Sequence, residues 1–293
     1  MIKIPNQVIT HAGKFHADDV FSTALLQIIN PNITVTRVFS VPEDTDALIY
    51  DIGWGKFDHH QKDAEIRENG VPFAAFGLLW REFGKQVLEQ GCTPEQAEQE
   101  QQRFDENFIQ PLDLEDNTGC GHPLADAIGL FNPSWDSSEN PDDCFVEAVQ
   151  FAKTILQHKI DSIFSIYRAK LLVESALKEA QNHIVILSRF APWRLYLVGS
   201  DAEFVVYPSQ RGGYNAQTVP ISNDSNISKF DFPEEWAGKP DQELKQLSGI
   251  PTLRFCHNNR FLVATETLED AVKACLWTQK HEQPNSIEQD SIE

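Results

Sequence analysis

No stretch of about 18 or more apolar residues occurs in this chain of 293 residues, so the sequence offers no helix of the length that crosses a membrane. The first residues, Met1 to Gln7, also lack the basic and apolar regions of a secretory signal. We therefore expect a cytoplasmic protein that has no membrane partner.

Cysteine is scarce and scattered. The five cysteines form no Cys-x-x-Cys pair, which argues against both a disulfide framework and a zinc site made of thiolates. We expect all five to be buried, reduced thiols: Cys92, Cys120, Cys144, Cys256 and Cys275.

Basic residues are outnumbered, with 24 Lys and Arg against 44 Asp and Glu and a formal net charge of −20. Duplex binding by a basic face needs clustered Lys and Arg to neutralise phosphates, so the charge argues against non-specific duplex binding of this kind. A nucleic-acid substrate would need a local positive groove or bound metal ions.

Hydrophobic residues make up 41% of the chain, which is enough for two cores of ordinary size. The pattern predicts an α/β protein whose N-terminal domain, residues 1–182, has a parallel sheet, because strands and helices alternate there. Its last part, residues 144–182, is a helical connector. A smaller α+β domain covers residues 183–281, and the acidic residues 282–293 form a mobile tail. Strands are expected at 7–10, 33–39, 47–50, 183–187, 194–198, 203–207, 253–256 and 261–264, and helices at 73–90 and 268–280.

The segment from Asp51 to Gln61 contains two carboxylates and two adjacent imidazoles directly after the strand 47–50. Asp51 would lie at the carboxyl end of that strand, where open α/β sheets bind their ligands. A glycine-containing turn would return Asp58, His59 and His60 toward it. Carboxylate and imidazole together suit manganese or zinc. The alternative is a polar loop whose histidines cap a strand end.

A second cluster, His11, His16, Asp18 and Asp19, follows the strand 7–10 at the start of a helix. The two aspartates could simply favour the helix dipole, but that alternative does not explain the two histidines. Downstream, Asp113 and Asp116 stand three residues apart, and either could complete a metal cluster or be a surface carboxylate. The three motifs together predict a two-metal centre, in which a bridging carboxylate holds two ions that activate a water for phosphoryl transfer.

These motifs carry a resemblance. Asp58-His59-His60, with Asp51, the upstream His11 to Asp18 and the downstream Asp116, is similar to the DHH phosphoesterase superfamily. The chain resembles the MYG1 family more closely, over residues 8–275, through Thr10 to Asp19, Asp58 to Gln61, Gly212 to Pro220, Ser248 to Pro251 and Phe255 to His257. The resemblance implies a DHH-type catalytic domain and a smaller substrate domain.

The resemblance also implies roles for single residues. His11, His16 and Asp51 would hold one metal; Asp18, Asp51, His59 and Asp116 would hold the other, with Asp51 as the bridge and Asp113 as the substitute for Asp116. The superfamily's opening His-x-x-x-Asp-x-Asp is one residue shorter than its counterpart here, so His16 stands in for an aspartate. His60 would face the scissile phosphate, and Asp58 would orient an imidazole. Substrate phosphates would meet Arg211, Gly212, Gly213, His257 and Arg260, unless Gly212 and Gly213 are only a hairpin turn.

The implied function is a metal-dependent phosphodiester hydrolase that uses two divalent ions, with manganese preferred over magnesium or zinc. The expected activity is that of a 3′-to-5′ exonuclease on single-stranded RNA or short oligonucleotides. Three alternatives stay open: a small-molecule phosphatase, a non-catalytic metal-binding protein, and a zinc amidohydrolase, since His16-Ala-Asp18-Asp19 also resembles the His-Pro-Asp-Asp motif of sugar deacetylases. A homodimer is one arrangement that the sequence leaves open.

Overall fold

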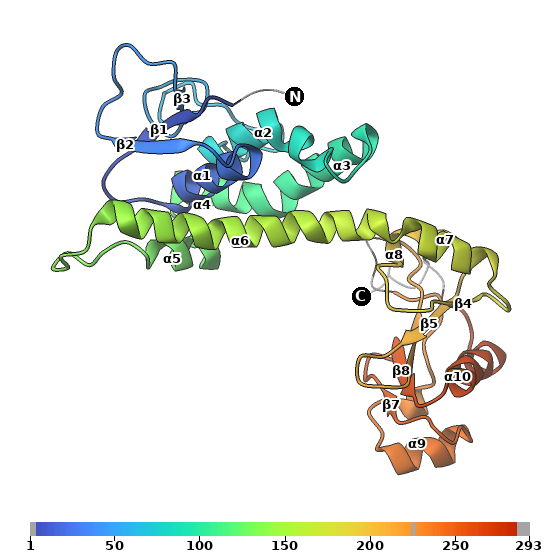
Figure 1. Ribbon diagram of the computed structural model, residues 1–293. Coiled ribbons are helices and arrows are strands. Elements are labelled where there is room, and N and C mark those ends of the chain that lie inside the picture. Colours follow the sequence, from blue (N-terminus) through green and yellow to red (C-terminus); the bar gives the residue numbers. More distant parts are fainter. Residues whose placement is uncertain (1–3, 224, 226, 286–293) are drawn as a thin grey trace. The chain divides into compact units, whose positions relative to one another are not determined.

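The computed structural model describes residues 4–285 except 224 and 226 (Figure 1). The chain divides into two compact units, Met1–Phe164 and Ser165–Glu293, within helix α6 (Pro141–Arg168), whereas we placed the domain boundary after residue 182. From residue 286 on, the acidic segment that we expected to be a mobile tail lies outside the described residues.

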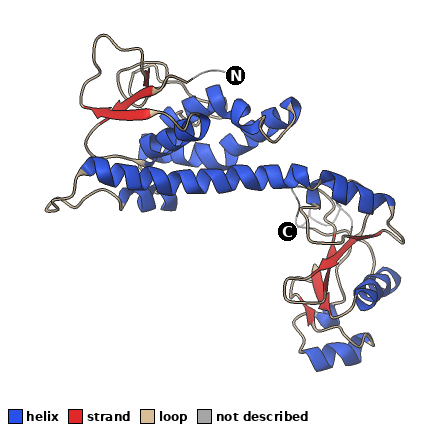
Figure 2. Ribbon diagram, viewed as in Figure 1, coloured by secondary structure: helices blue, strands red, loops and turns tan. Residues whose placement is uncertain are grey.

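The first unit contains a parallel sheet in which β1 (Gln7–His11) lies between β2 (Thr34–Val38) and β3 (Leu48–Ile49) (Figure 2). The expected parallel order is therefore confirmed. Ile9 pairs with Ile49, and two residues further along both strands the same register reaches His11 and Asp51. Parallel strands thus bring the first residues of two separate motifs to one edge of the sheet.

Helices bury the apolar faces of this unit. In α1 (Ala17–Ile29), Val20, Phe21, Ala24 and Leu25 recur at helical spacing and are all buried. The helix expected at 73–90 is α2 (Ala75–Leu88). The remaining elements are α3 (Pro94–Phe104), a π-helical turn (Asp105–Ile109), α4 (Gln110–Thr118), α5 (Pro123–Gly129) and α6. None of the described helices is long and apolar enough to span a bilayer.

The second unit has a five-stranded sheet in the order β4-β5-β6-β8-β7, in which β4 and β5 are parallel and the other neighbours antiparallel. This mixture of helices and a mixed sheet agrees with the expected α+β class. Its strands are β4 (Ile184–Ile186), β5 (Phe204–Pro208), β6 (Tyr214–Thr218), β7 (Phe255–Cys256) and β8 (Leu262–Thr265). Its helices are α7 (Lys170–Lys178), α8 (Arg194–Leu197), a 3-10 turn (Glu234–Trp236), α9 (Asp241–Ser248) and α10 (Leu268–His281).

Two sequence predictions are wrong. The segment 194–198 forms the short helix α8 instead of a strand, because Leu197 packs into a core with α7 while the Arg194 guanidinium donates to backbone carbonyls that include Asn223. Short apolar runs do not separate the two structures by pattern alone. Of the cysteines, only Cys256 and Cys275 are buried; Cys120 is exposed, and Cys92 and Cys144 are half-buried.

Candidate metal centre

The loop after β3 returns its histidines to the edge of the sheet. The Asp51 backbone N–H donates to the Phe57 carbonyl at 2.9 Å, and Tyr50 pairs with Phe57, so the chain folds back at once. Gly53 permits the turn, since its φ is +90° and an added Cβ would lie 2.9 Å from a methyl group of Val41. Asp51 itself has a φ of 54°, an unusual conformation for a non-glycine residue and one that often marks a functional site.

Asp51 stands between two groups of side chains and turns one oxygen to each. Its Oδ2 lies 3.2 Å from His11 Nε2, which is also 3.2 Å from Asp19 Oδ2. Its Oδ1 lies 3.3 Å from His59 Nε2, which is 3.2 Å from Asp116 Oδ2. A carboxylate with its two oxygens in different clusters has the arrangement of a bridging ligand.

Three overlapping clusters have donor atoms within 4.8 Å of one another, close enough for a metal ion. One contains His11, Asp19 and Asp51, and another contains Asp18, His59 and Asp116. The third consists of Asp51, His59 and His60. The structure thus brings together all three sequence motifs, from β1 and α1, from the loop after β3, and from α4.

Hydrogen bonds on the far side of each ring orient the two central imidazoles. His11 Nδ1 lies 3.2 Å from the Ala12 carbonyl oxygen, and His59 Nδ1 lies 3.3 Å from Asn117 Oδ1. The Asn117 amide nitrogen donates to two backbone carbonyls, which leaves its oxygen as the acceptor. In the neutral ring with its proton on Nδ1, the Nε2 lone pairs of His11 and His59 therefore face carboxylate oxygens, and these electron-rich atoms repel each other. A cation between them would remove the repulsion.

The buried atoms fit a divalent cation. Asp19 Oδ2 and His59 Nε2 are buried and make no hydrogen bond, and His59 Nε2 is not aligned for one to Asp51 despite their short separation. Buried polar atoms without partners are uncommon in folded proteins. Oxygen and imidazole donors together suit manganese or zinc. This donor set is therefore one that metal ions would complete.

Burial and the closeness of the charged groups shift the pKa values of the cluster. Burial raises the pKa of the Asp19 carboxyl to about 7, and burial together with the charge of Asp51 raises the pKa of Asp18 well above its usual range. Burial alone would lower the pKa values of His11 and His59. The close approach and negative charge of the neighbouring carboxylates, foremost Asp51, outweigh the effect of burial and raise both pKa values to about 9.

Metal binding at this cluster is expected to release protons. Because His11 and His59 have pKa values of about 9 without metal, an ion must displace their protons at neutral pH, so its apparent affinity should rise with pH up to about 9. Calorimetric titration with manganese at pH 6.5 to 8.5, in buffers of different ionisation heat, measures the released protons. An affinity that is flat over this range would contradict the assignment of these imidazoles as ligands.

The structure places Asp19 beside His11 and Asp51, where we expected His16. His16 is the residue before α1, and its backbone N–H donates to Asp19 Oδ1 at 2.8 Å. This cap turns Asp19 Oδ2 toward His11, whereas the His16 side chain is exposed, and its ring centroid lies 5.9 Å from that of His11. Helix capping thus decides which neighbour joins the cluster.

Of the two downstream aspartates, Asp116 joins the cluster and Asp113 does not. Asp113 Oδ2 pairs with Arg67 Nη2 at 2.7 Å, and Asp113 Oδ1 accepts from the Gly77 backbone N–H at 3.2 Å.

Asp18 both caps a helix and contributes to the cluster. Its carboxylate accepts from the first backbone N–H groups of α2, those of Ala75 and Phe76, and still faces His59 at 4.0 Å.

Asp58 holds the loop and one imidazole. It accepts from the backbone N–H groups of Trp54 at 2.6 Å and His59 at 2.8 Å, and His60 Nδ1 lies 2.7 Å from its Oδ1. Although burial opposes the effect, these hydrogen bonds, first that of His60, lower the pKa of Asp58. The His60 side chain is half exposed, so its other nitrogen is free to meet a ligand.

The cluster opens into a cleft of about 730 Å³. Among the described residues that line it, Lys14 is the single Lys or Arg, and Glu115, Asp116 and Asp126 are the acids. Lys14 is exposed on the loop between β1 and α1. An anionic substrate would therefore find one ammonium group in the same cleft as the candidate metal ligands.

The five residues expected to bind substrate all lie in the second unit, but not together. Arg211, Gly212 and Gly213 form the hairpin turn between β5 and β6, in which Gly213 has a φ of 66° and lies against the Thr265 carbonyl, so only glycine fits. The turn that we kept as an alternative is thus present. Arg211 also lines a separate pocket.

The other two predicted substrate residues are engaged elsewhere in the same unit. His257 Nδ1 accepts from the Asn259 backbone N–H at 3.0 Å, and its ring packs against Phe261. Arg260 pairs with Asp231 at 3.2 Å. Neither residue is among those that line the pocket beside Arg211.

Comparison with known proteins agrees with the motifs. A family model named MYG1_exonuc and described as "Uncharacterised protein family (UPF0160)" matches residues 7–277. The chain belongs to the MYG1 family. Among its relatives, the "MYG1 protein" of Dictyostelium discoideum is 27% identical, over 92% of this chain and 95% of the relative. The "MYG1 exonuclease" of Homo sapiens is 28% identical, over 92% of this chain and 84% of the relative. No solved structure matches.

Sequence reasoning on this MYG1-family chain missed two residues of the centre. Asp19 was recognised as part of the motif but was assigned only to the helix start, and its position three residues after the cap was the signal that it could turn back toward β1. Asn117 directly follows Asp116, and a side-chain amide beside a candidate ligand is a common partner for an imidazole. The sequence signal alone does not decide the Asn117 contact, which depends on the packing of α4 against the loop that carries His59.

Proposed function

We propose that this chain is a metal-dependent phosphodiester hydrolase with a DHH-type N-terminal domain, acting on single-stranded RNA or short oligonucleotides as a 3′-to-5′ exonuclease. The observation that carries the proposal is Asp51, whose two carboxylate oxygens face two different clusters of buried acids and imidazoles. The relatives named "MYG1 exonuclease" support nuclease activity.

Two divalent ions, manganese by preference, are part of this proposal. His11, Asp19 and Asp51 would hold one, and the second would lie among Asp51 and the cluster formed by Asp18, His59 and Asp116. Bound there, such ions would polarise the phosphoryl oxygens and lower the pKa of an attacking water.

Two residues of the chain would act directly on the substrate. His60, oriented at Nδ1 by Asp58, keeps its other nitrogen free to give a proton to the leaving oxygen. Lys14, the exposed ammonium in the cleft, would contact the phosphate. One lysine against three acids favours the end of a single strand over a duplex, whose many phosphates would be repelled.

The zinc amidohydrolase alternative loses support, because His16, the first residue of its motif, lies outside the three clusters. A small-molecule phosphatase and a non-catalytic metal-binding protein differ from the exonuclease in what they hydrolyse, so an assay separates them. The decisive experiment is metal analysis of the purified protein together with a substrate screen under added manganese.

The screen uses single-stranded RNA and DNA labelled at either end, dinucleotides and pyrophosphate. Stepwise release of mononucleotides from the 3′ end supports the proposal. Release from the 5′ end overturns the polarity, and cleavage of pyrophosphate alone overturns the exonuclease. A protein that binds metal and cleaves nothing supports the non-catalytic alternative.

His60→Gln is expected to lower kcat for oligonucleotides by roughly 10²–10⁴-fold, the usual contribution of general acid–base catalysis. The bound metal content should stay the same, because His60 is half exposed and the other clusters are complete without it. Single-turnover hydrolysis measured beside metal analysis checks both parts. Loss of metal in the variant would make His60 a ligand, and full activity would remove it from the proton transfer.

A further inference from the structure

The sheet of the second unit is covered on one face along its length. Side chains that alternate along the strands, including Phe204, Val206, Ala216 and Val263, point to this face and are all buried. They form one core with Ala271 and other residues of α10. This face is therefore closed by the helix.

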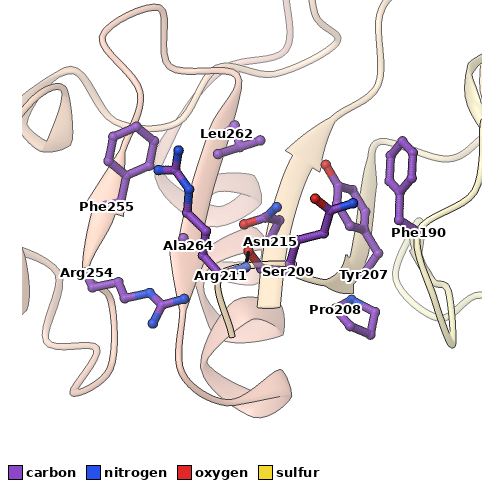
Figure 3. Close-up of a pocket in the computed structure, with 11 residues that line it drawn as sticks. Phe190, Tyr207, Pro208, Ser209, Arg211, Asn215, Arg254, Phe255, Leu262 and Ala264 are labelled. Atoms are coloured by element: carbon purple, nitrogen blue, oxygen red, sulfur yellow. Dashed lines mark hydrogen bonds between the residues drawn. The ribbon is translucent and has the colours of Figure 1, made fainter. Parts of the chain in front are cut away.

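Within the described part of the chain, the opposite face is covered only at one end. Val185 and Val205, on β4 and β5, are buried there with residues of α7 and α8. Beyond them the strand register sets four side chains in a row across the sheet: Tyr207 pairs with Asn215, Asn215 with Ala264, and Ala264 with Phe255. From Asn215 onward these residues are only partly buried, and the row lines a pocket of about 620 Å³. Figure 3 shows this row together with Phe190, which lies on the opposite side of the pocket from Phe255.

Two arginines give the pocket a positive charge. Arg211 comes from the β5–β6 turn, is exposed, and makes no side-chain hydrogen bond or ion pair within the described part of the chain. Arg254 precedes β7 and donates from Nη2 to the Gly212 carbonyl, and its other guanidinium N–H groups have no partner among the described residues. No Asp or Glu is among the described residues that line the pocket, although the chain carries a net charge of −20. The pocket is thus a local positive site on an acidic protein.

Aromatic rings stand beside these charges. Phe255 is 44% exposed and Phe190 is 55% exposed, which is unusual for large apolar side chains. The ring of Phe190 packs edge-on against Tyr207 at 5.2 Å between centroids, so its position is supported from the sheet. Ala264 is small and leaves open space between Phe255 and Asn215. The Asn215 amide offers both a hydrogen-bond donor and an acceptor.

We propose that this pocket binds one nucleotide of a single strand, with its phosphate on Arg211 and Arg254 and its base stacked on Phe255. Arginine forks suit phosphate oxygens, and aromatic faces stack bases of any sequence. A phosphate alone would leave the rings without a partner, and an apolar ligand would leave two guanidinium groups desolvated. The volume suits a ligand of nucleotide size.

The proposal rests on the proposed function only in its choice of a nucleotide as ligand, and it is tested without turnover. The full chain in excess EDTA, which removes any metal from the first unit, is titrated by calorimetry with adenosine monophosphate, adenosine and ribose 5-phosphate. The nucleotide is expected to bind more tightly than either fragment. Equal binding of nucleotide and ribose 5-phosphate would reduce the pocket to an anion site and overturn the proposal, as would no nucleotide binding.

Variants distinguish the contribution of the base to binding from that of the phosphate. Phe255→Ala should weaken nucleotide binding on the order of tenfold and leave ribose 5-phosphate unaffected, and Phe255→Leu, which keeps apolar bulk, should do the same. Arg211→Gln should weaken both phosphate ligands on the order of tenfold and leave adenosine unaffected. The control is Lys280→Gln, which removes one exposed charge from α10 and should change nothing. An equal loss in Lys280→Gln would mean general charge attraction and overturn the site.

Failure of the proposed function is measured separately. The unaltered protein with added manganese is assayed on a small chromogenic phosphodiester, which needs only the metal centre of the first unit. Nucleotide binding without diester hydrolysis refutes the hydrolase and supports the pocket. Hydrolysis without nucleotide binding supports the hydrolase and overturns the pocket.

Discussion

Asp51→Asn is expected to abolish metal binding and hydrolysis together. The amide is the same size but carries no charge and has a single acceptor oxygen, so it could serve only one of the two clusters that Asp51 now faces. Two cations held close together repel each other and need an anion between them. Loss of a partner behind a metal ligand costs about 10–100-fold in affinity, and loss of the shared ligand should exceed that.

Metal content after dialysis and hydrolysis of a chromogenic phosphodiester measure the two effects. Asp63→Asn is the matched control, since Asp63 is an exposed carboxylate of the same loop that belongs to none of the clusters. It should bind metal and hydrolyse like the unaltered protein. Two tightly bound ions in Asp51→Asn would show that this residue is not the bridge.

Arg67→Met is expected to destabilise the first unit by about 3–5 kcal/mol, the usual result of removing one partner from a buried ion pair. The guanidinium is 7% exposed, donates to both oxygens of Asp105 and lies 2.7 Å from Asp113, whose side chain is fully buried. It also lies 3.7 Å from the centre of the Phe73 ring. Methionine would keep much of the packing and leave the Asp113 charge uncompensated.

The loss should depend on pH. Burial raises the pKa of Asp113 to about 7 even beside Arg67, and without the arginine that pKa should rise further. A carboxyl whose folded pKa is above its unfolded value makes the fold less stable as pH rises, so the variant should be weakest above pH 7 and recover toward pH 5. Adding Asp113→Asn to Arg67→Met should restore part of the loss at high pH.

Urea unfolding at several pH values checks this network. Arg81→Met is the control, because Arg81 lies over the same Phe73 ring but pairs with Glu65 at the surface, with its own side chain 46% exposed. Surface pairs contribute about 0–1 kcal/mol, so its loss should be small and nearly independent of pH. Equal losses in the two variants would mean that stacking on Phe73, rather than the buried charge, carries the stability.

The order of elements in the first unit follows from the sequence. Apolar runs that alternate with helical patterns predict a parallel sheet, and in such a sheet the residues that follow two strands meet at one edge. The sequence therefore predicts that His11 and Asp51 lie together, and in the structure His11 Nε2 is 3.2 Å from Asp51 Oδ2. The types of donor atom in the cluster, carboxylate and imidazole, are also local properties of the motifs.

Packing decided which of two neighbouring residues joins the cluster. Asp113 and Asp116 differ by about 60° around the axis of α4, and the docking of that helix sends one to Arg67 and the other to His59. The π-helical turn just before α4 changes the rotational phase that a regular helix would have, which no periodicity in the sequence records. At the start of α1, a capping hydrogen bond likewise selects Asp19 over His16.

The pocket of the second unit was decided by tertiary structure altogether. Asn215 and Ala264 are neighbours because β6 pairs with β8, and Phe255 joins them through β7. In the sequence Asn215 is 40 residues before Phe255, and the two belong to different motifs. The sequence by itself determined which chemistry the chain could carry and the order of its strands and helices. Only the register between distant strands and the angle at which each helix docks decided which side chains meet, because both depend on contacts between segments that local patterns do not encode.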